Sequence, residues 1–278
     1  MFFLSRQSIV INTGFNHPFI NFKNYYFFMH DLAHIDFYNS FINKFYYKFF
    51  IKFIYRNSNR IFTISEFSKF KIMNLLGFKS SQIHVVCCGI NENFFSKKKI
   101  KPILKFSYIL CVSNRKKHKN EDLLLNGFLE IAKLHNYKLI LLGNSTFYQD
   151  EFILNNNLND KIIFLNSISD NELVSLYRHA KALICPSLYE GFSLPVAEAM
   201  ASRIPIFISD IPVHHEISGE NAIFFDSNSH FDLARKFNKN IKHYDSKMID
   251  SAYDLSKKYK WGNVCKNINK IINNKDMI

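Results

Sequence analysis

The chain has 278 residues, which allows one large domain or two of ordinary size, and we predict two. Hydrophobic residues make up 47% of the chain, so the composition excludes a disordered protein and predicts substantial cores. The formal charge of +13 predicts anionic partners. Charge alone does not distinguish nucleic acid, acidic lipid headgroups and phosphorylated small molecules.

Cysteine usage and the apolar runs indicate the compartment. Five cysteines occur without any Cys-x-x-Cys spacing, which argues against a structural zinc site. Their odd number, and the early interruption of the apolar start by Arg6, argue against a secreted protein with a leader. No apolar run reaches the roughly 20 residues that a membrane-spanning helix needs. We therefore predict a cytoplasmic protein, either free or peripheral at the inner face of the cell membrane.

In the first hundred residues, four short apolar runs are candidate strands, at residues 8–11, 25–29, 60–64 and 83–86. A helix is expected over residues 41–56, which are rich in Phe, Tyr and Ile. A cation occupies every fourth position of this helix: Lys44, Lys48, Lys52 and Arg56. On a helix, this spacing forms one slowly drifting stripe. Such a helix is typical either of an anionic membrane surface or of a packed core helix with one solvated edge.

The second half alternates short apolar runs with helical patterns. The runs are residues 108–112, 138–142, 161–165, 182–185, 205–208 and 222–225. Continuous apolar strands separated by helices predict a parallel sheet covered on both faces, in a doubly wound α/β domain. The charged segment 97–102, which ends in proline, reads as an interdomain linker or as an ordinary solvated loop. We expect domains at residues 1–102 and 103–250, with closing helices at 251–278.

The loop after the strand at 108–112 carries several cations. In open α/β sheets, ligands bind outside the carboxyl ends of the strands, so such loops are candidate sites. Arg115 and Lys119 lie here, and a helix follows with Asn120 as a suitable N-cap. Cations beside a helix N-terminus suit a diphosphate. The alternative is an exposed basic turn.

The loop after the strand at 182–185 is more specific. Glu190 lies in this loop, Pro195 suits the first helical position, and Glu198 falls in the first turn. Backbone N–H groups at the start of this helix are free to bind ligand oxygens, namely those of Phe192, Ser193 and Leu194. The Glu198 carboxylate can accept two hydrogen bonds from a vicinal diol such as a ribose. The alternative is a first-turn glutamate favoured by the helix dipole.

Residues 190–201, with Glu190 and Glu198 separated by seven residues, resemble the Glu-x7-Glu signature of family 4 retaining glycosyltransferases. Other segments resemble landmarks of that family in the same order: the acceptor-side His30-Asp31, residues 63–69, the phosphate-binding loop around residues 114–120, the base-binding stretch at 164–170, and Trp261 in the closing helices. The resemblance covers about residues 8 to 270.

This resemblance implies an α/β fold of GT-B type, in which two Rossmann-like domains with parallel sheets face a cleft. It implies that four residues take part in catalysis: His30, Arg115, Lys119 and Glu190. It also implies that six residues bind the donor: Ile168, Gly191, Phe192, Ser193, Leu194 and Glu198. Arg115 and Lys119 would neutralise the diphosphate, and Glu198 would bind the ribose. Glu190 would hold the transferred sugar, with no metal or other cofactor.

The implied activity is transfer of a hexose from a nucleotide-diphosphate sugar to a glycan or lipid-linked acceptor, with retention of configuration, in bacterial surface polysaccharide synthesis. GDP-mannose, UDP-hexoses and dTDP-sugars all remain open as donors. Two departures stand out: Ser193 replaces the usual glycine, and the chain begins near the family's fourth strand, so its N-terminal domain is expected to be truncated. The alternative is a catalytically impaired or regulatory protein that binds nucleotide-sugar without transfer. No nucleic-acid-binding motif is present, and we expect no such partner.

Overall fold

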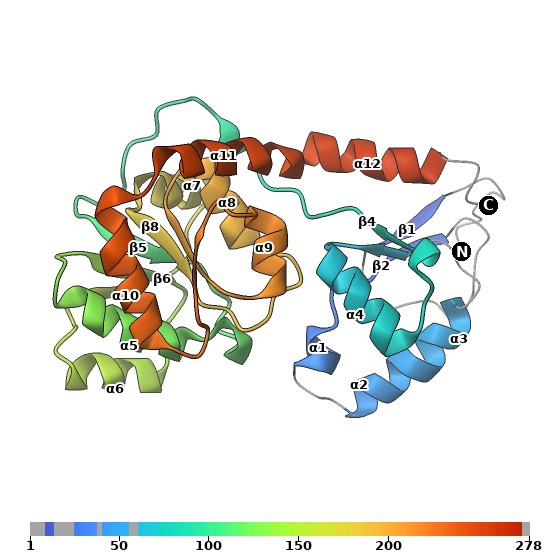
Figure 1. Ribbon diagram of the computed structural model, residues 1–278, viewed down its shortest axis with the longest axis horizontal. Coiled ribbons are helices and arrows are strands. Elements are labelled where there is room, and N and C mark those ends of the chain that lie inside the picture. The colour runs from blue at the N-terminus through green and yellow to red at the C-terminus, as the bar shows by residue number, and fades with distance from the viewer. Residues whose placement is uncertain (1–8, 14–24, 38–40, 56–60, 274–278) are drawn as a thin grey trace. The chain divides into compact units, whose positions relative to one another are not determined.

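A computed structural model describes residues 9–13, 25–37, 41–55 and 61–273 (Figure 1). The chain forms two compact units. Unit 1 comprises the described residues up to Cys88, together with Glu190–Phe192 and the C-terminal segment from Gly262. Unit 2 comprises Gly89–Tyr189 and Ser193–Trp261. The predicted starts of two strands, Ser8 and Arg60, and the cation Arg56 lie outside the described residues.

Unit 2 contains a six-stranded sheet. Its strands are β5 (Tyr108–Cys111), β6 (Lys138–Leu142), β7 (Ile162–Leu165), β8 (Ala182–Cys185), β9 (Ile206–Ser209) and β10 (Ile223–Phe225). Their order is β10-β9-β8-β5-β6-β7, and every pairing is parallel. Strands β5, β8 and β9 are buried at each position, as continuous apolar runs require. The predicted doubly wound parallel sheet is confirmed.

Helices cover both faces of this sheet (Figure 1). The α-helices of unit 2 are α5 (Glu121–Ala132), α6 (Phe147–Asn155), α7 (Asp170–His179), α8 (Leu194–Ser202), α9 (Pro212–Ser218), α10 (His230–Asn240) and α11 (Ser246–Ser256). On one face, Phe128 of α5 and Phe237 of α10 pack in the same core as Ile109 and Leu139 of the sheet. On the other face, α8 contacts α7, α9 and α11.

The strand order creates a switch point between β5 and β8. From β5 the chain proceeds to β6 and β7 on one side, and then returns to β8 on the other side. The connections that leave β5 and β8 therefore diverge at the carboxyl edge of the sheet. This is where doubly wound sheets bind their ligands.

The charged segment predicted as a linker is fastened to unit 2. The Arg178 guanidinium of α7 donates hydrogen bonds to the carbonyl of Asn93 at 2.9 Å and to that of Lys98 at 2.8 Å. The Ser175 hydroxyl donates to the Lys101 carbonyl at 2.8 Å. These contacts place residues 89–101 in unit 2, so the boundary near this point lies at Cys88 and not at residue 102.

Unit 1 contains a four-stranded parallel sheet in chain order. Its strands are β1 (Val10–Asn12), β2 (Tyr25–Phe28), β3 (Ile61–Thr63) and β4 (Ile83–Val85). The helices between these strands are α1 (Ala33–Asp36), α2 (Phe41–Phe45), the π-helix η1 (Tyr46–Ile51), α3 (Lys52–Tyr55) and α4 (Glu66–Leu76). Phe27, Ile51 and Ile72 belong to the core of this unit.

The chain closes with α12 (Trp261–Asn273). Ile268 and Ile272 of this helix pack against Tyr26 and Phe62 of the unit 1 sheet. Of the predicted closing helices, α11 therefore belongs to unit 2, and α12 from Gly262 onward belongs to unit 1. Among the described residues, no helix combines the length and apolar character needed to cross a bilayer.

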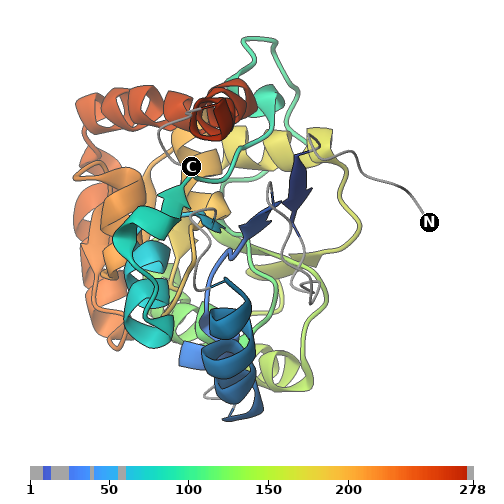
Figure 2. The ribbon, with the colours of Figure 1, turned by 90° about the vertical axis from the view of Figure 1, so that its right-hand side faces the viewer.

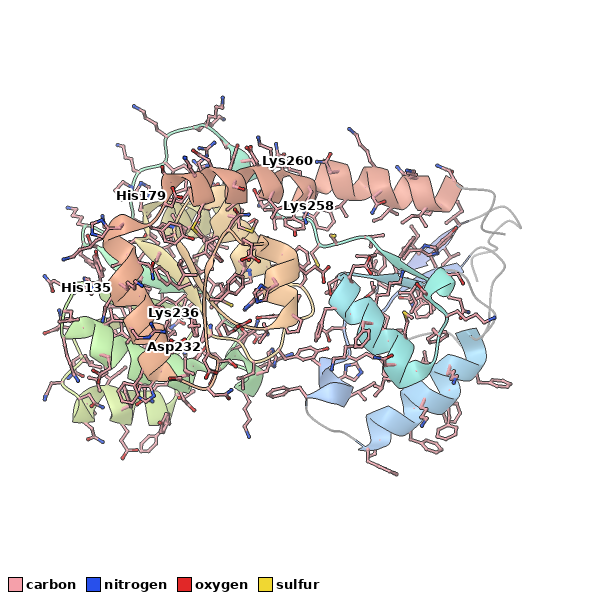
Figure 3. The ribbon with its side chains drawn as sticks, in the orientation of Figure 1. His135, His179, Asp232, Lys236, Lys258 and Lys260 are labelled. Carbon is pink, nitrogen blue, oxygen red and sulfur yellow. The ribbon has the colours of Figure 1, made fainter. Side chains whose placement is uncertain are left out.

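The turn before α12 is held by ring contacts within unit 2. The ammonium group of Lys258 lies 4.8 Å from the centre of the Tyr259 ring, and that of Lys260 lies 4.7 Å from the Phe95 ring (Figure 3). A Cβ atom at Gly89 would lie 2.2 Å from the Trp261 ring, so only glycine allows this close approach.

Candidate functional site

The loop after β5 holds Arg115 in a network of protein acceptors. The guanidinium donates hydrogen bonds to the Glu121 carboxylate at 2.8 Å and to Gln149 Oε1 at 3.0 Å. It also donates to the carbonyls of Leu142 at 3.0 Å and Gly143 at 3.3 Å. Arg115 therefore braces its loop against the ends of β6 and α6. The role of Arg115 at the donor diphosphate stays a prediction.

Lys119 lies at the end of the short 3-10 helix η4 (Lys117–Lys119) and is half-buried. Its charge acts on Cys111, the last residue of β5. Burial raises the pKa of the Cys111 thiol well above its usual value, and the positive charges of Lys119 and Arg115 oppose that rise. Both cations therefore contribute positive potential at the carboxyl end of β5.

Asn120 joins three loops. It occupies the N-cap position of α5, but its backbone is left-handed, with φ 55° and ψ 41°, and its side chain makes no capping hydrogen bond. Its amide instead donates to the carbonyls of Pro186 at 3.2 Å and Ser227 at 2.9 Å. The Leu188 N–H also donates to the His118 carbonyl at 2.8 Å. The predicted side-chain cap is wrong because this amide ties the loops after β5, β8 and β10 together.

Helix α8 begins at Leu194, so Pro195 is its second residue and Glu198 its fifth. The sequence predicted Pro195 at the first helical position and Glu198 in the first turn, which is one position nearer the helix start, with a ribose contact or a favourable helix dipole as the two explanations for the glutamate. Burial raises the pKa of the Glu198 carboxyl to about 7, which the Tyr177 hydroxyl opposes and the Asp170 charge reinforces. The carboxylate that follows β8 is thus held in a poorly solvated environment.

Ser193 precedes α8 and is fixed by a residue that sequence reasoning missed. The Ser193 backbone is left-handed, with φ 75° and ψ 68°, which explains why glycine would suit this position. Its hydroxyl lies 3.2 Å from Nε2 of His214, a fully buried side chain on α9. His214 Nδ1 lies 2.8 Å from the Ser209 carbonyl, which can only accept, so Nδ1 carries a proton. No motif in the sequence marks His214.

Ile168 lies in the connection from β7 to α7. This connection crosses from the edge strand toward β8 on the other side of β5. Ser169 and Glu172 form a capping box at the start of α7, in which the Ser169 N–H donates to the Glu172 carboxylate at 2.8 Å. The capping box involves Ser169 and Glu172, and Ile168 is the residue immediately before it.

In unit 1, the segment Glu190–Phe192 packs beside the residues that follow β2 and β3. The Ser65 and Ser68 hydroxyls donate to the Gly191 carbonyl at 2.6 Å and 3.2 Å. A Cβ atom at Gly191 would lie 2.7 Å from Asp31 Oδ2 and 3.0 Å from Ile64 Cδ1. Only glycine fits this position without a shift of its neighbours.

His30 lies two residues after the end of β2 and is half-buried. Its Nε2 atom lies 3.2 Å from the Thr13 carbonyl, and its ring stacks on Phe28 with 5.5 Å between ring centres. The neighbouring Asp31 accepts a hydrogen bond from the Ala33 N–H at 3.0 Å. The predicted pair His30-Asp31 thus follows a strand of the unit 1 sheet at its carboxyl edge.

The predicted site residues divide between the two units. Unit 1 holds His30, Glu190, Gly191 and Phe192, and unit 2 holds Arg115, Lys119, Ile168, Ser193, Leu194 and Glu198. Glu190 and Phe192 are buried, while Leu194 is exposed. Within unit 2, the residues concentrate on the two loops that leave β5 and β8 at the switch point.

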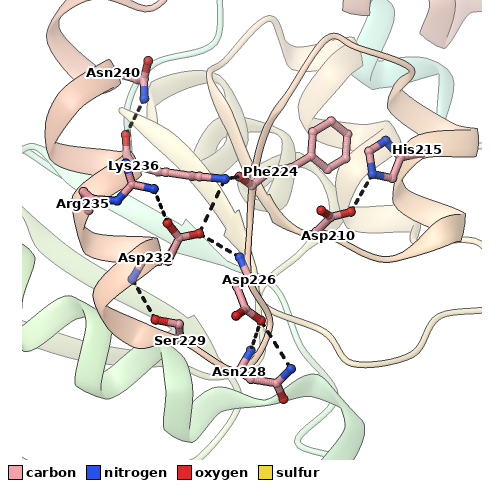
Figure 4. A network of polar contacts seen from close by, with 10 residues as sticks. All are labelled: Asp210, His215, Phe224, Asp226, Asn228, Ser229, Asp232, Arg235, Lys236 and Asn240. Carbon is pink, nitrogen blue, oxygen red and sulfur yellow. Dashed lines mark hydrogen bonds and ion pairs between the residues drawn. The ribbon is translucent and has the colours of Figure 1, made fainter.

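Hydrogen bonds and ion pairs of nearby side chains hold the loops after β9 and β10 (Figure 4). Asp210 after β9 accepts from His215 Nε2 at 2.7 Å. Asp226 after β10 donates its backbone N–H to Asp232 at 2.9 Å, and Lys236 lies 3.5 Å from the same carboxylate. These acidic side chains stabilise the loops beside the switch point and are already paired.

The two parallel α/β units, one with a cationic loop and a half-buried carboxylate at the switch point of a doubly wound sheet, define a protein of the GT-B type. The chain belongs to the family Glycosyl transferases group 1, whose profile matches residues 92–255. The resemblance to family 4 retaining glycosyltransferases is thereby confirmed at the level of the family.

Two relatives and one solved structure illustrate the similarity. The chain is 30% identical over 223 residues to the O-antigen chain mannosyltransferase RfbU of Salmonella typhimurium, covering 78% of this chain and 60% of the relative. It is 24% identical to the O-antigen chain mannosyltransferase B of Escherichia coli, covering 73% and 57%. It shares its fold with HepE of Anabaena, solved with UDP-glucose, at a TM-score of 0.73 and 14% identity, covering 89% of this chain and 71% of that one. The chain thus spans about 60% of the length of RfbU.

Proposed function

We propose that the protein transfers a hexose, and specifically mannose, from a nucleotide-diphosphate sugar to a growing surface polysaccharide or its lipid-linked precursor, with retention of configuration. Both relatives described above are named O-antigen chain mannosyltransferases. The observation that carries the proposal is the location of Lys119 and Glu198 in the two connections that leave β5 and β8 at the switch point, with Glu198 in the second turn of α8. The protein would do this work in the cytoplasm.

In this proposal the donor lies along unit 2. The Lys119 ammonium binds the diphosphate, and Glu198 accepts hydrogen bonds from the two ribose hydroxyls. The backbone near Ile168 receives the base, and the N–H groups at the start of α8 bind donor oxygens. Arg115 contributes its charge and holds the loop in place, because its guanidinium already has four protein acceptors.

The chemistry requires negative charge to be stabilised as the donor bond breaks. The bond between the anomeric carbon and the diphosphate oxygen breaks, and the acceptor oxygen forms a new bond on the same face of the sugar. A fixed cation beside the leaving diphosphate lowers this barrier because the charge develops in the transition state. Glu190 and the amides of residues 191–194 would hold the transferred sugar, with His30 as a further polar contact to it.

A panel of donors tests this function. The protein is incubated with GDP-mannose, UDP-hexoses and dTDP-sugars and a lipid-linked saccharide acceptor, and the products are identified by mass spectrometry. We expect one added hexose from GDP-mannose and an α-configured linkage, as retention from an α-linked donor requires. Donor binding without transfer to any acceptor would instead support the alternative of a protein that binds nucleotide-sugar only.

A further inference from the structure

A cavity of about 430 Å³ lies in unit 2, between α7, α8, α11 and the 3-10 helix η3 (Glu92–Phe95). Helix α8 contacts the other three elements, and they lie together in both views of the ribbon (Figures 1 and 2). Arg178 lines the cavity from the last turn of α7, before β8, and Ser202 lines it from the end of α8, before β9. Both residues lie where the chain enters a strand. The cavity is therefore at the amino edge of the sheet, opposite the loops that leave β5 and β8.

Positive charge dominates the walls of this cavity. Among the described residues that line it, Lys97, Arg178 and Arg203 are cations and none is acidic. The Cζ atom of Arg203 lies 3.9 Å from the centre of the Tyr253 ring, and Nη1 pairs with the Asp250 carboxylate at 2.8 Å. A guanidinium has several N–H donors, so this ion pair uses only part of its capacity. The walls therefore suit an anion, and a phosphate in particular.

Arg203 occupies a position at which glycine is favoured. It is the C-cap of α8 and its backbone is left-handed, with φ 59° and ψ 46°. Helices commonly end on glycine in this conformation, because a Cβ atom makes it unfavourable. The arginine instead brings a guanidinium to the wall of the cavity, where the Tyr253 ring supports it. The side chain of Arg203, and not its backbone, explains this residue.

Ser202 contributes an unused hydroxyl to the same wall. The residue is 9% exposed, and its Oγ atom has no hydrogen-bond partner among the described residues. A buried hydroxyl without a partner is unfavourable and indicates a missing water or ligand. Rotation about χ1 between staggered positions can direct it toward the cavity. The occupant is therefore expected to carry a hydrogen-bonding group beside its negative charge.

Aromatic rings limit the kind of anion that fits. The rings of Phe95 and Tyr253 have centres 6.2 Å apart and planes at 54° to each other. Rings tilted in this way do not form the parallel slot that stacks on both faces of a nucleobase, whereas the C–H groups of a sugar pack on a single ring face. The volume lies in the lower part of the range for small-molecule sites, about 300–1,000 Å³.

We propose that this cavity binds a phosphorylated monosaccharide, with its phosphate on Arg203 and Lys97 and a sugar hydroxyl on Ser202. Arg178 shapes the wall, because its guanidinium already donates to the carbonyls of residues 93, 94 and 98. The site is distinct from the proposed donor site at the carboxyl edge. It does not depend on the proposed transfer reaction.

Isothermal titration calorimetry of the full chain tests the proposal. The probes are glucose 6-phosphate, mannose 6-phosphate, free mannose and inorganic phosphate. We expect a hexose phosphate to bind at one site per chain. Mannose and inorganic phosphate should each bind at least about tenfold more weakly, because each lacks part of the hydrogen bonds. GDP should not displace the hexose phosphate, and Lys119→Ala should bind it as the unaltered protein does, because both concern the opposite edge of the sheet.

Variants of the cavity wall locate the binding site. Arg203→Gln should weaken hexose phosphate binding at least about tenfold, since a hydrogen bond to a charged group is lost. Its matched control is Arg235→Gln, which also alters an exposed arginine paired with an aspartate of unit 2 and should bind normally. Ser202→Ala should weaken binding about fivefold without a lower thermal midpoint, because the hydroxyl has no hydrogen bond to lose in the unliganded protein. Circular dichroism checks that each variant is folded.

Several results would overturn the proposal. One is that neither hexose phosphate binds, or that inorganic phosphate binds as tightly as they do. Displacement by GDP, or loss of binding in Lys119→Ala, would place the compound in the donor site. Equal affinity of Arg203→Gln, Ser202→Ala and the Arg235→Gln control would show that binding takes place elsewhere on the protein.

Discussion

The two units use their hydrophobic residues differently. In unit 2, β5, β8 and β9 are buried at each position, and the loops that leave the sheet are joined by hydrogen bonds through Asn120. In unit 1, the sheet has four strands, and the helical segment of residues 41–55 (α2, η1 and α3) exposes aromatic rings such as those of Phe49 and Phe53. A wide buried sheet can hold several loops in fixed positions. Unit 2 therefore holds its loops in fixed positions, while unit 1 leaves several aromatic side chains exposed to water.

Within unit 2, two neighbouring cations show the same contrast on a smaller scale. The Arg115 side chain is 19% exposed and paired with Glu121, whereas Lys119 follows on the same loop at the end of η4. Arg115 thus stabilises the scaffold, and our proposal assigns the diphosphate contact to Lys119. Variants that separate stability from turnover can test this division.

The largest effect is expected from Arg115→Met. This change leaves the Glu121 carboxylate, which is 9% exposed, without its cation. An uncompensated buried charge costs about 3–5 kcal/mol, so the free energy of unfolding measured in urea should fall by that order. The double variant Arg115→Met, Glu121→Gln removes the unpaired carboxylate charge and should recover much of the lost free energy of unfolding.

The double variant also separates two roles for Arg115. If Arg115 only positions its loop, recovery of stability should bring recovery of donor turnover. If its charge contacts the diphosphate directly, turnover should stay low in a protein of restored stability. A single variant as stable as the unaltered protein would show that the network contributes little to the fold.

The second effect concerns Glu198→Gln and depends on pH. The pKa of Glu198 is raised by burial from 4.5 to about 7 in the folded protein. The protonated carboxyl therefore favours the fold, and this contribution is lost as pH rises from about 4.5 through 7. Glutamine stays neutral, so the variant should gain about 2–3 kcal/mol relative to the unaltered protein across this range. Urea unfolding at pH 5 and pH 8 measures the difference in the free energy of unfolding between the variant and the unaltered protein. The same difference at both pH values would contradict the prediction.

The same group should link donor binding to pH. A ribose diol favours the ionised carboxylate, which accepts both hydrogen bonds. Nucleoside diphosphate should therefore bind more tightly to the unaltered protein as pH rises through 7, with release of a proton. Glu198→Gln should bind weakly without this pH dependence. Calorimetry in buffers of different ionisation enthalpy measures the proton directly.

The sequence predicted the six strands of unit 2 closely because buried parallel strands are continuous apolar runs. It did not predict the environment of Glu198, because an exposed glutamate near a helix start and a half-buried one have the same local sequence pattern. It also missed the partners of Arg115, since Gln149 and Glu121 come together only through the folded sheet. Asn120 was predicted to cap the following helix with its side chain because asparagine is common at this position before a helix. Burial and contacts over long sequence separation decide these cases, and neither is visible in local spacing.

Lys119→Ala tests the ligand-facing cation. Removal of the ammonium should lower donor turnover at least tenfold, equivalent to about 1.4 kcal/mol of transition-state stabilisation. The free energy of unfolding should change little compared with Arg115→Met. Lys116→Ala, an exposed lysine of the same loop, is the matched control. Equal turnover in the Lys119 and Lys116 variants would remove Lys119 from the site.

The smallest effect is expected at Ser193, where two contributions to the free energy of unfolding have opposite signs. Its left-handed backbone costs a non-glycine residue about 1 kcal/mol, and its hydroxyl makes a hydrogen bond with His214 of similar size. Ser193→Gly removes both terms and should leave stability nearly unchanged. Ser193→Ala keeps the backbone strain, loses the hydrogen bond and leaves His214 Nε2 buried, so it should be less stable by about 1 kcal/mol. Thermal unfolding of the two variants compares them, and an alanine variant as stable as the glycine variant would show that His214 does not hold this loop.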